Sequence, residues 1–194
     1  MRLLLSLIVL MLWMHDIAWG TSLFFRRLAD SSLTLTKQKV KYDPAYFRLS
    51  YPNGDPPADR GVCTDVVIRA YRKMGIDLQK EVHEDMLNHF KKYPQRWGLK
   101  SADWNIDHRR VPNLMTFFSR KGVVKSISRD ASEYLPGDIV CWDLGGGITH
   151  IGIVSGVMSM DKKRYMIVHN VGAGQVLEDY LFVHPIIGHY QYKK

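Results

Sequence analysis

Residues 138–157 read DIVCWDLGGGITHIGIVSGV, and this stretch decides the class of fold. Two runs rich in β-branched and aromatic residues, 138–142 and 149–157, flank a glycine-rich segment, which is typical of two strands joined by a turn. The second half of the chain therefore predicts a sheet, and we expect its other strands at 123–127, 164–170 and 186–192.

The first half of the chain has the periodicity of helices instead. Apolar side chains form a helical stripe over residues 63–74, and Gly75 is suited to end that helix. Further helices are expected over 79–93 and 112–122, and an amphipathic stretch precedes them at 22–35. Helices followed by strands predict an α+β fold, with an antiparallel sheet covered by helices on one face.

The first twenty residues have the composition of a secretory signal. A short basic start, Met1-Arg2, precedes the apolar run LLLSLIVLMLWM, and the small residues Ala18 and Gly20 mark a cleavage point. The apolar run is shorter than the roughly 20 residues that a spanning helix needs. We therefore expect residues 1–20 to be a cleaved signal peptide. Residues 21–194 would form one exported domain of the periplasm or cell envelope, with no stable membrane span after cleavage.

The composition is that of a globular domain with an excess of positive charge. Hydrophobic residues make up 46% of the 194 residues, and 27 basic against 19 acidic side chains give a formal net charge of +8. This charge favours an anionic partner such as nucleic acid, anionic lipid or an acidic cell-wall polymer. Export, and the lack of an interleaved Arg and aromatic RNA-binding motif, argue against nucleic acid.

Cys63 lies where the proline-rich loop of residues 51–60 becomes a helix. Unpaired backbone N–H groups and the helix dipole at such a position favour a thiolate and can stabilise an oxyanion. Cys63 is therefore a candidate nucleophile. The alternative is a disulfide between Cys63 and Cys141, because oxidising compartments pair even numbers of cysteines. In that case the domain would be a non-catalytic envelope-binding module.

Two histidines in the expected strands could complete a catalytic site. His150 begins the segment HIGIVSGV, and His169 lies in YMIVHNVG. A thiol at a helix start and two strand histidines have the composition of a nucleophile, a base and an orienting group. No metal or cofactor is expected, because His83 and His89 are six residues apart and lie on different faces of their helix.

Three segments resemble the NlpC/P60 family of cell-wall cysteine peptidases. They are RGVCTDVV at 60–67, PGDIVCW with THIGIV within 136–154, and MIVHN at 166–170, in the family's order Cys, His, His. More closely, the chain is similar to the bacterial family called domain of unknown function 1287, through GVCTDVVIRAYR, NIDHRRVPNL and GAGQVLED. Thr64-Asp65 stand where NlpC/P60 sequences usually carry Ser-Gly.

The resemblance implies a circularly permuted papain-like fold and roles for individual residues. Cys63 would be the nucleophile, His150 the proton carrier and His169 the orienting residue. Tyr51, twelve residues before the cysteine, stands where the family has an oxyanion tyrosine. Asp107 is the rival orienting group, because a carboxylate can also hold a protonated imidazole.

The resemblance further implies an exported cysteine hydrolase that cleaves an amide bond, with peptidoglycan stem peptides as the expected substrate. The net charge of +8 is consistent with peptidoglycan or another anionic envelope polymer as the partner. Another acyl or amide transfer by the same triad, including transglutamination or lipid deacylation, remains an alternative.

Overall fold

The structure, a computed structural model, describes residues 22–194, and its centre is a six-stranded sheet in the order β3-β8-β4-β5-β6-β7. All neighbouring strands are antiparallel, which confirms the sheet expected from the sequence. The strands are β3 (Val123–Val124), β4 (Ile139–Gly145), β5 (Ile148–Met158), β6 (Tyr165–His169), β7 (Val176–Glu178) and β8 (Ile186–Gln191).

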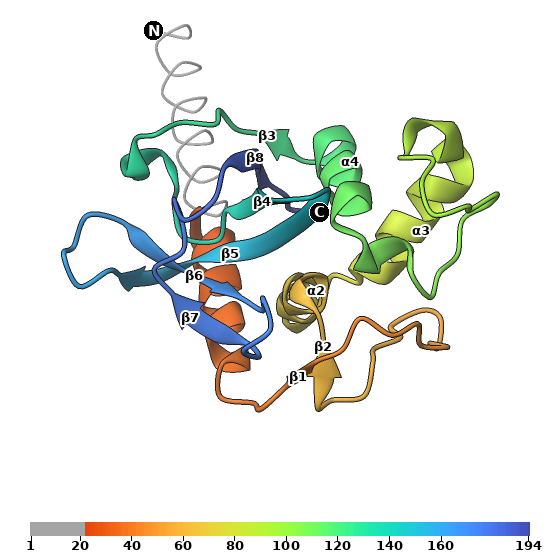
Figure 1. Cartoon of the computed structure of the whole chain (residues 1–194), viewed down its shortest axis with the longest axis horizontal. Coiled ribbons are helices and arrows are strands. Elements are labelled where there is room, and N and C mark those ends of the chain that lie inside the picture. The colour runs from red at the N-terminus through yellow and green to blue at the C-terminus, as the bar shows by residue number, and fades with distance from the viewer. Residues whose placement is uncertain (1–21) are drawn as a thin grey trace, which may run out of the picture.

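Helices cover one face of this sheet (Figure 1). Residues 22–35 are helical, and they are followed by α2 (Cys63–Lys73), α3 (Leu78–His89) and α4 (Val111–Lys121). The shorter elements are a parallel pair, β1 (Lys41–Tyr42) and β2 (Arg60–Gly61), and the 3₁₀ helices η1 (Phe90–Lys92), η2 (Asp107–Arg109) and η3 (Ala131–Glu133). The α+β class with helices on one face is therefore confirmed.

The sheet has an apolar core on each face. The larger cluster packs α2, α4 and the helix at 22–35 against strand residues such as Cys141 and Ile151. The smaller cluster lies on the opposite face and includes Trp142, Tyr180 and Leu181. Because successive residues of a strand face opposite sides, burial on both faces explains why β4 and β5 are apolar almost throughout.

Local interactions fix both ends of α2. At its start, the carboxylate of Asp65 accepts a hydrogen bond from the N–H of Val62 at 2.7 Å, which stabilises the first turn. The helix ends after Lys73, and Gly75 adopts a left-handed conformation with a φ of 77°. Glycine tolerates this conformation without a steric penalty, so the expected C-terminal cap is confirmed.

The turn between β4 and β5 sets the register of the two longest strands. Gly145, Gly146 and Gly147 all have positive φ values, of 86°, 62° and 81°. Beyond this turn Trp142 lies opposite His150, and Cys141 lies opposite Ile151. The glycines therefore determine which face of the sheet receives each of these side chains.

The expected and observed elements differ mainly at their ends. The helix expected over 79–93 is α3 followed by the separate 3₁₀ helix η1, and the strand expected over 123–127 has only two residues. β7 was not expected, because three residues are too few to show a period. The signal peptide predicted at residues 1–20 lies outside the described residues. Over residues 22–194, no helix has the length and apolarity to cross a membrane.

Candidate active site

Cys63 is the first residue of α2, and only 7% of it is exposed. The chain just before it is attached to the end of β6, because Asn170 donates a hydrogen bond from Nδ2 to the carbonyl of Gly61 at 3.2 Å. The start of α2 is thus held where β6 ends and β5 continues. This placement brings the cysteine to the strands that carry both predicted histidines.

Burial is the largest influence on the Cys63 thiol and raises its pKa. The charge of Asp65 acts in the same direction, whereas hydrogen bonds from the backbone N–H groups of Ile151, Thr64 and Cys63 itself lower the pKa, and the outcome is a pKa of about 12. The expected thiolate is therefore corrected for the substrate-free protein: desolvation outweighs the helix-start N–H groups, and the thiol is neutral.

His150 directly precedes Ile151, whose backbone N–H contacts the sulfur, but its side chain lies on the opposite face of the strand from that of Ile151. Its Nε2 lies 2.9 Å from Nδ1 of His169 on the neighbouring strand β6. Both rings are buried, with exposures of 2% and 0%. Burial lowers the pKa of His150 to about 3, and the charge of His169 acts in the same direction. The structure thus brings the two sequence-predicted histidines into direct contact.

Glu178 of β7 continues this series of side chains, and the sequence analysis did not single it out. Its Oε2 lies 3.1 Å from Nε2 of His169. Burial lowers the pKa of His169, while the charge and hydrogen bond of Glu178 oppose that effect. The available signal was the segment GAGQVLED, which carried the family resemblance and contains this glutamate.

The two imidazoles lie on the face of the sheet away from α2, whereas the thiol lies on the helical face. Trp142 and Tyr180 lie beside the histidines on the face away from α2, with ring centroids 5.7 Å from His150 and 4.3 Å from His169 respectively. The thiol comes from the helical face and reaches the plane of the sheet at the N–H of Ile151. Among the described side chains, no direct hydrogen bond joins the Cys63 sulfur to His150. A catalytic cysteine–histidine pair requires this contact, and the described residues do not form it.

Tyr51 and Asp107 belong to a different cluster, centred on His83 of α3. The ring of Tyr51 lies 5.2 Å from that of His83, and His83 Nδ1 lies 3.0 Å from Asp107 Oδ2. The same carboxylate oxygen accepts the N–H of Asp103 at 2.7 Å. Asp107 therefore does not orient His150, because its own partners hold it in this cluster. Tyr51 is likewise held in this cluster, which corrects the position expected for it.

Tyr42 of β1 is a tyrosine that lies near the thiol. Burial raises its pKa, and electrostatic interactions with Cys63 and with the carboxylate of Asp65 add to this effect. β1 pairs with β2, which leads directly to the cysteine, so that Tyr42 lies opposite Gly61. Sequence reasoning missed this residue because the pairing of two two-residue strands has no periodic signal.

A buried ion pair holds the β1 segment, here β1 and the residues that follow it up to Ala45, against α2. Arg109 of η2 contacts both oxygens of Asp65 at 3.0 Å, and each side chain is 1% exposed. The same guanidinium donates to the carbonyl of Ala45 at 2.8 Å and to that of Asp43 at 3.3 Å. Asp65, one of the two departures from the NlpC/P60 pattern, therefore has a structural role beside the nucleophile.

Cys63 and Cys141 are both free and buried, so the structure does not contain the disulfide of the alternative interpretation. Cys141 is fully enclosed, and burial raises its pKa well above the usual range. In the part of the chain that the structure describes, no group of three or more His, Cys, Asp or Glu side chains is arranged to hold a metal ion.

The fold and site together define a class: an α+β domain with a cysteine at a helix start and two histidines in contact on adjacent strands. The chain belongs to the family "Domain of unknown function (DUF1287)", whose model matches residues 29–192. It is 51% identical over 165 residues to the Escherichia coli K12 "Uncharacterized protein YijF", an overlap of 85% of this chain and 80% of that protein.

A solved structure, that of NlpC2 from Trichomonas vaginalis, is similar over 88% of this chain and 47% of its own, with a TM-score of 0.46 and 17% identity. The chain therefore spans about half the length of that structure.

Proposed function

We propose that the chain is an exported cysteine hydrolase that cleaves an amide bond in peptidoglycan stem peptides. One observation carries the proposal: the Cys63 thiol, at the start of α2, accepts the backbone N–H of Ile151, the residue after His150, whose Nε2 lies 2.9 Å from Nδ1 of His169. This arrangement supplies a nucleophile, a base and a group that fixes the base. The resemblance of the surrounding segments to cell-wall peptidases supports the choice of substrate.

The proposed reaction uses Nδ1 of His150, because Nε2 already faces His169. The Cys63 sulfur attacks the carbonyl carbon of the scissile amide while Nδ1 takes the thiol proton. The C–N bond then breaks, the amine leaves with that proton, and a thioester remains on Cys63. Water, deprotonated by His150, hydrolyses the thioester and releases the acid, and the proton returns to the thiol.

The oxyanion of the tetrahedral intermediate would be bound at the start of α2. The N–H groups of Cys63 and Thr64 already point at the sulfur, where the first-turn N–H groups of a helix have no intrahelical partner. The hydroxyl of Tyr42, whose side chain is partly exposed beside the thiol, would be a further donor.

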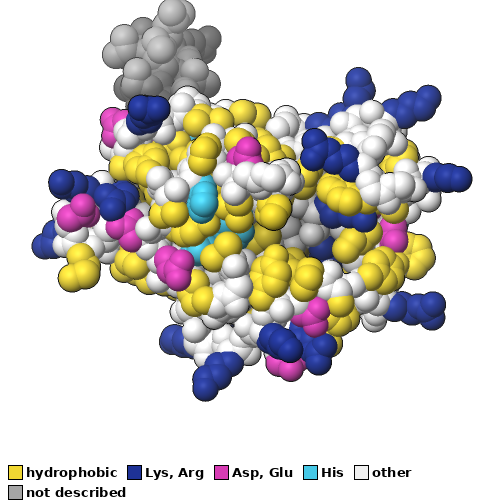
Figure 2. Space-filling model, in the orientation of Figure 1, with side chains coloured by type: hydrophobic (Ala, Val, Ile, Leu, Met, Phe, Trp, Pro, Cys, Tyr) yellow, Lys and Arg dark blue, Asp and Glu magenta, His cyan; other side chains and the backbone are white. Residues whose placement is uncertain are grey.

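The charge of the protein supports an anionic polymer as substrate. In Figure 2, Lys and Arg side chains project around the rim of the visible face, while hydrophobic and histidine side chains occupy its interior. A rim of this kind would attract the carboxylates and phosphates of the cell envelope without blocking an apolar interior. Export through the signal predicted at residues 1–20 is part of the same proposal.

The test is digestion of purified cell-wall sacculi, with the released fragments identified by mass spectrometry. Wild-type protein is expected to release fragments cut at an amide bond of the stem peptide. Cys63→Ala and His150→Ala should each abolish release, whereas Cys141→Ala, which removes the other thiol, should retain it.

Equal release by the Cys63→Ala variant would exclude the proposed nucleophile. Binding of wild-type protein to sacculi without any release would instead favour the envelope-binding module.

A further inference from the structure

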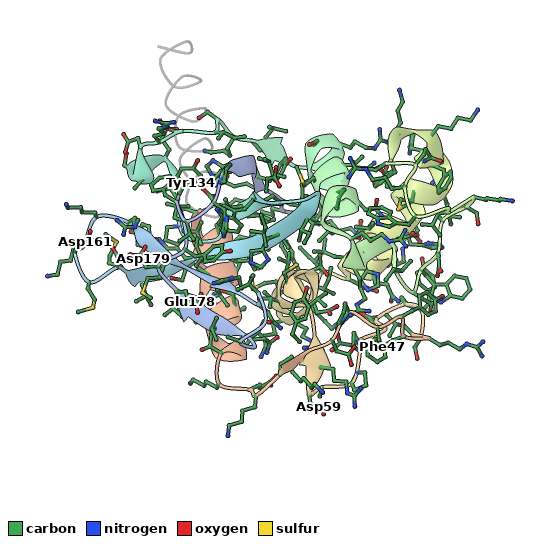
Figure 3. All side chains as sticks on the ribbon, viewed as in Figure 1. Phe47, Asp59, Tyr134, Asp161, Glu178 and Asp179 are labelled. Carbon is green, nitrogen blue, oxygen red and sulfur yellow. The ribbon has the colours of Figure 1, made fainter. Side chains whose placement is uncertain are left out.

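The site extends one strand beyond the two histidines. Glu178 lies on β7, at the edge of the sheet (Figure 3), and its carboxylate contacts His169 at 3.1 Å. Ile167 lies opposite Glu178, and His169 lies opposite Val176, so the two contacting residues are diagonal neighbours on one face. Three adjacent strands, β5, β6 and β7, thus supply one continuous row of polar side chains.

We propose that Glu178 is a positioning residue of this site, which fixes the proton positions of both histidines and supplies the negative charge that balances the imidazolium formed during turnover. This inference rests on the proposed cysteine hydrolase mechanism. Glu178 acts through His169 and does not itself touch the reacting atoms.

The order of protons follows from the carboxylate. An ionised carboxylate only accepts hydrogen bonds, so the proton of neutral His169 lies on Nε2, which faces Glu178. Nδ1 of His169 then has a free lone pair and accepts the N–H of His150 Nε2 at 2.9 Å. Neutral His150 is left with an unprotonated Nδ1, which is the nitrogen that must take the thiol proton.

The charge of Glu178 offsets the cost of forming an imidazolium in this buried site. Both imidazoles are buried, and burial disfavours the cation that forms when His150 accepts a proton. The other groups facing the pair are the ring of Trp142, the phenol of Tyr180, and His184, whose interaction with His150 disfavours the cation further. Glu178 is therefore the group that offsets the cation.

Burial of the two partners differs in a way that suits this role. The His169 side chain is fully buried, whereas the Glu178 side chain is 43% exposed. The carboxylate keeps contact with water, while its hydrogen bond passes the effect of its charge to the buried ring. The neighbouring Asp179 points elsewhere and pairs with Arg164 through two contacts of 2.6 Å (Figure 3).

The experiment compares Glu178→Ala and Glu178→Gln with Asp179→Asn, a matched loss of one carboxylate at the next position. Long-range ¹H–¹⁵N spectra of the imidazoles report their protonated nitrogens without any substrate. Wild type and Asp179→Asn should show both His150 and His169 protonated on Nε2. Glu178→Ala should show mixed tautomers at both residues, and Glu178→Gln, which retains an acceptor oxygen, should be less mixed.

Turnover of sacculi gives the second measurement. Both Glu178 variants should lose roughly 10- to 100-fold in rate, by analogy with the loss seen when the outer partner of a metal-bound histidine is removed. Their acid limb should move to lower pH, because losing the negative charge lowers the pKa of the histidine pair. A merely structural defect would lower the rate without moving that limb. Asp179→Asn should match wild type in both respects.

Unchanged tautomers and an unmoved acid limb in folded Glu178→Ala would overturn the proposal. If Glu178→Ala does not fold, unchanged tautomers and an unmoved acid limb in folded Glu178→Gln would overturn the proposal instead. Failure of the proposed function would give a different result. Wild-type protein would leave sacculi intact, while its histidines would still show the expected tautomers and Glu178→Ala would still lose them.

Discussion

Cys63 and His150 are both neutral in the substrate-free site, since burial raises the pKa of the thiol to about 12 and lowers that of the imidazole to about 3. In the proposed mechanism the nucleophile would therefore be generated by proton transfer during attack, with no thiolate–imidazolium pair stored beforehand. Two predictions at the scale of single residues follow from this state and from the contact between the histidines.

The first concerns alkylation of Cys63 by iodoacetamide. Because only the thiolate reacts and the pKa lies far above neutral, the rate should rise roughly tenfold per pH unit from pH 7 to 9. Cys141, which is fully enclosed, should react more slowly throughout. Mass spectrometry of labelled peptides measures both rates. A plateau for Cys63 at pH 6–7 would instead reveal a stored ion pair with His150.

The second concerns His169. Replacing it by Ala removes the partner of His150 Nε2, and a misplaced tautomer can cost roughly 10⁴-fold in turnover, as in the serine-protease triad. His169→Asn keeps a side-chain oxygen that can accept the same hydrogen bond, so it should retain more activity. Thermal unfolding must accompany the kinetics, because a buried unpaired group costs about 1–3 kcal/mol by itself. Equal turnover in folded His169→Ala and wild type would remove its orienting role.

The sequence predicted the cysteine and the two histidines as a group, because each lies in a segment with a recognisable pattern. It did not predict Glu178 or Tyr42, whose positions depend on strand pairs of two or three residues. It also misplaced Tyr51, since counting residues back from Cys63 says nothing about the path of the loop between them. Short strands and irregular loops are set by tertiary contacts, which no local period records.

At the scale of elements, the contact between η2 and α2 depends on the buried pair Asp65–Arg109. Arg109→Ala should lower the free energy of unfolding by about 3–5 kcal/mol, because it leaves a carboxylate buried without its partner. Chemical denaturation at neutral pH measures the loss.

The matched control for this prediction is the double variant Asp65→Asn, Arg109→Met. It removes both charges and keeps a side-chain oxygen for the N–H of Val62. Its stability should return most of the way to that of wild type. A loss in the double variant as large as in Arg109→Ala would show that the ion pair itself is not the cause.

The 3₁₀ helix η2 shows why the segment around it was hard to predict from the sequence. The helices and the glycine turn follow from periodicity and from backbone preferences, and both are confirmed. The segment 96–110 has no such period, and η2 is held by side-chain contacts to α2, α3 and the β1 segment. Contacts of this kind become visible only when the rest of the fold is in place.

At the scale of the whole molecule, buried histidines make stability depend on pH. Burial, followed by the charges of Arg109 and Arg72, lowers the pKa of His108 to about 3, and His150 has a similar value. The unfolded chain takes up these protons near pH 6.5, while the folded protein does not. Stability is therefore present above that pH and is lost as pH falls from about 6.5 towards 3.

Each histidine contributes a slope of up to about 1.4 kcal/mol per pH unit in this window. Denaturant unfolding at a series of pH values from 7 to 4 measures the total slope. His108→Gln, which cannot take up a proton, should reduce the slope by up to about 1.4 kcal/mol per pH unit, the contribution of one histidine. A slope identical to that of wild type would mean that His108 is protonated in the folded protein.

The position of β8 has a consequence for the order of events during synthesis. Residues 186–191 insert between β3 and β4, so β3 is not joined to the other four strands until they have left the ribosome. Until then the sheet edge of β4 is unpaired, and Tyr71 lacks the Tyr192 carbonyl to which its hydroxyl donates at 2.9 Å. An unfinished chain therefore lacks these partners of β4 and Tyr71, and we expect the six-stranded sheet to be completed only once residues 186–192 are available.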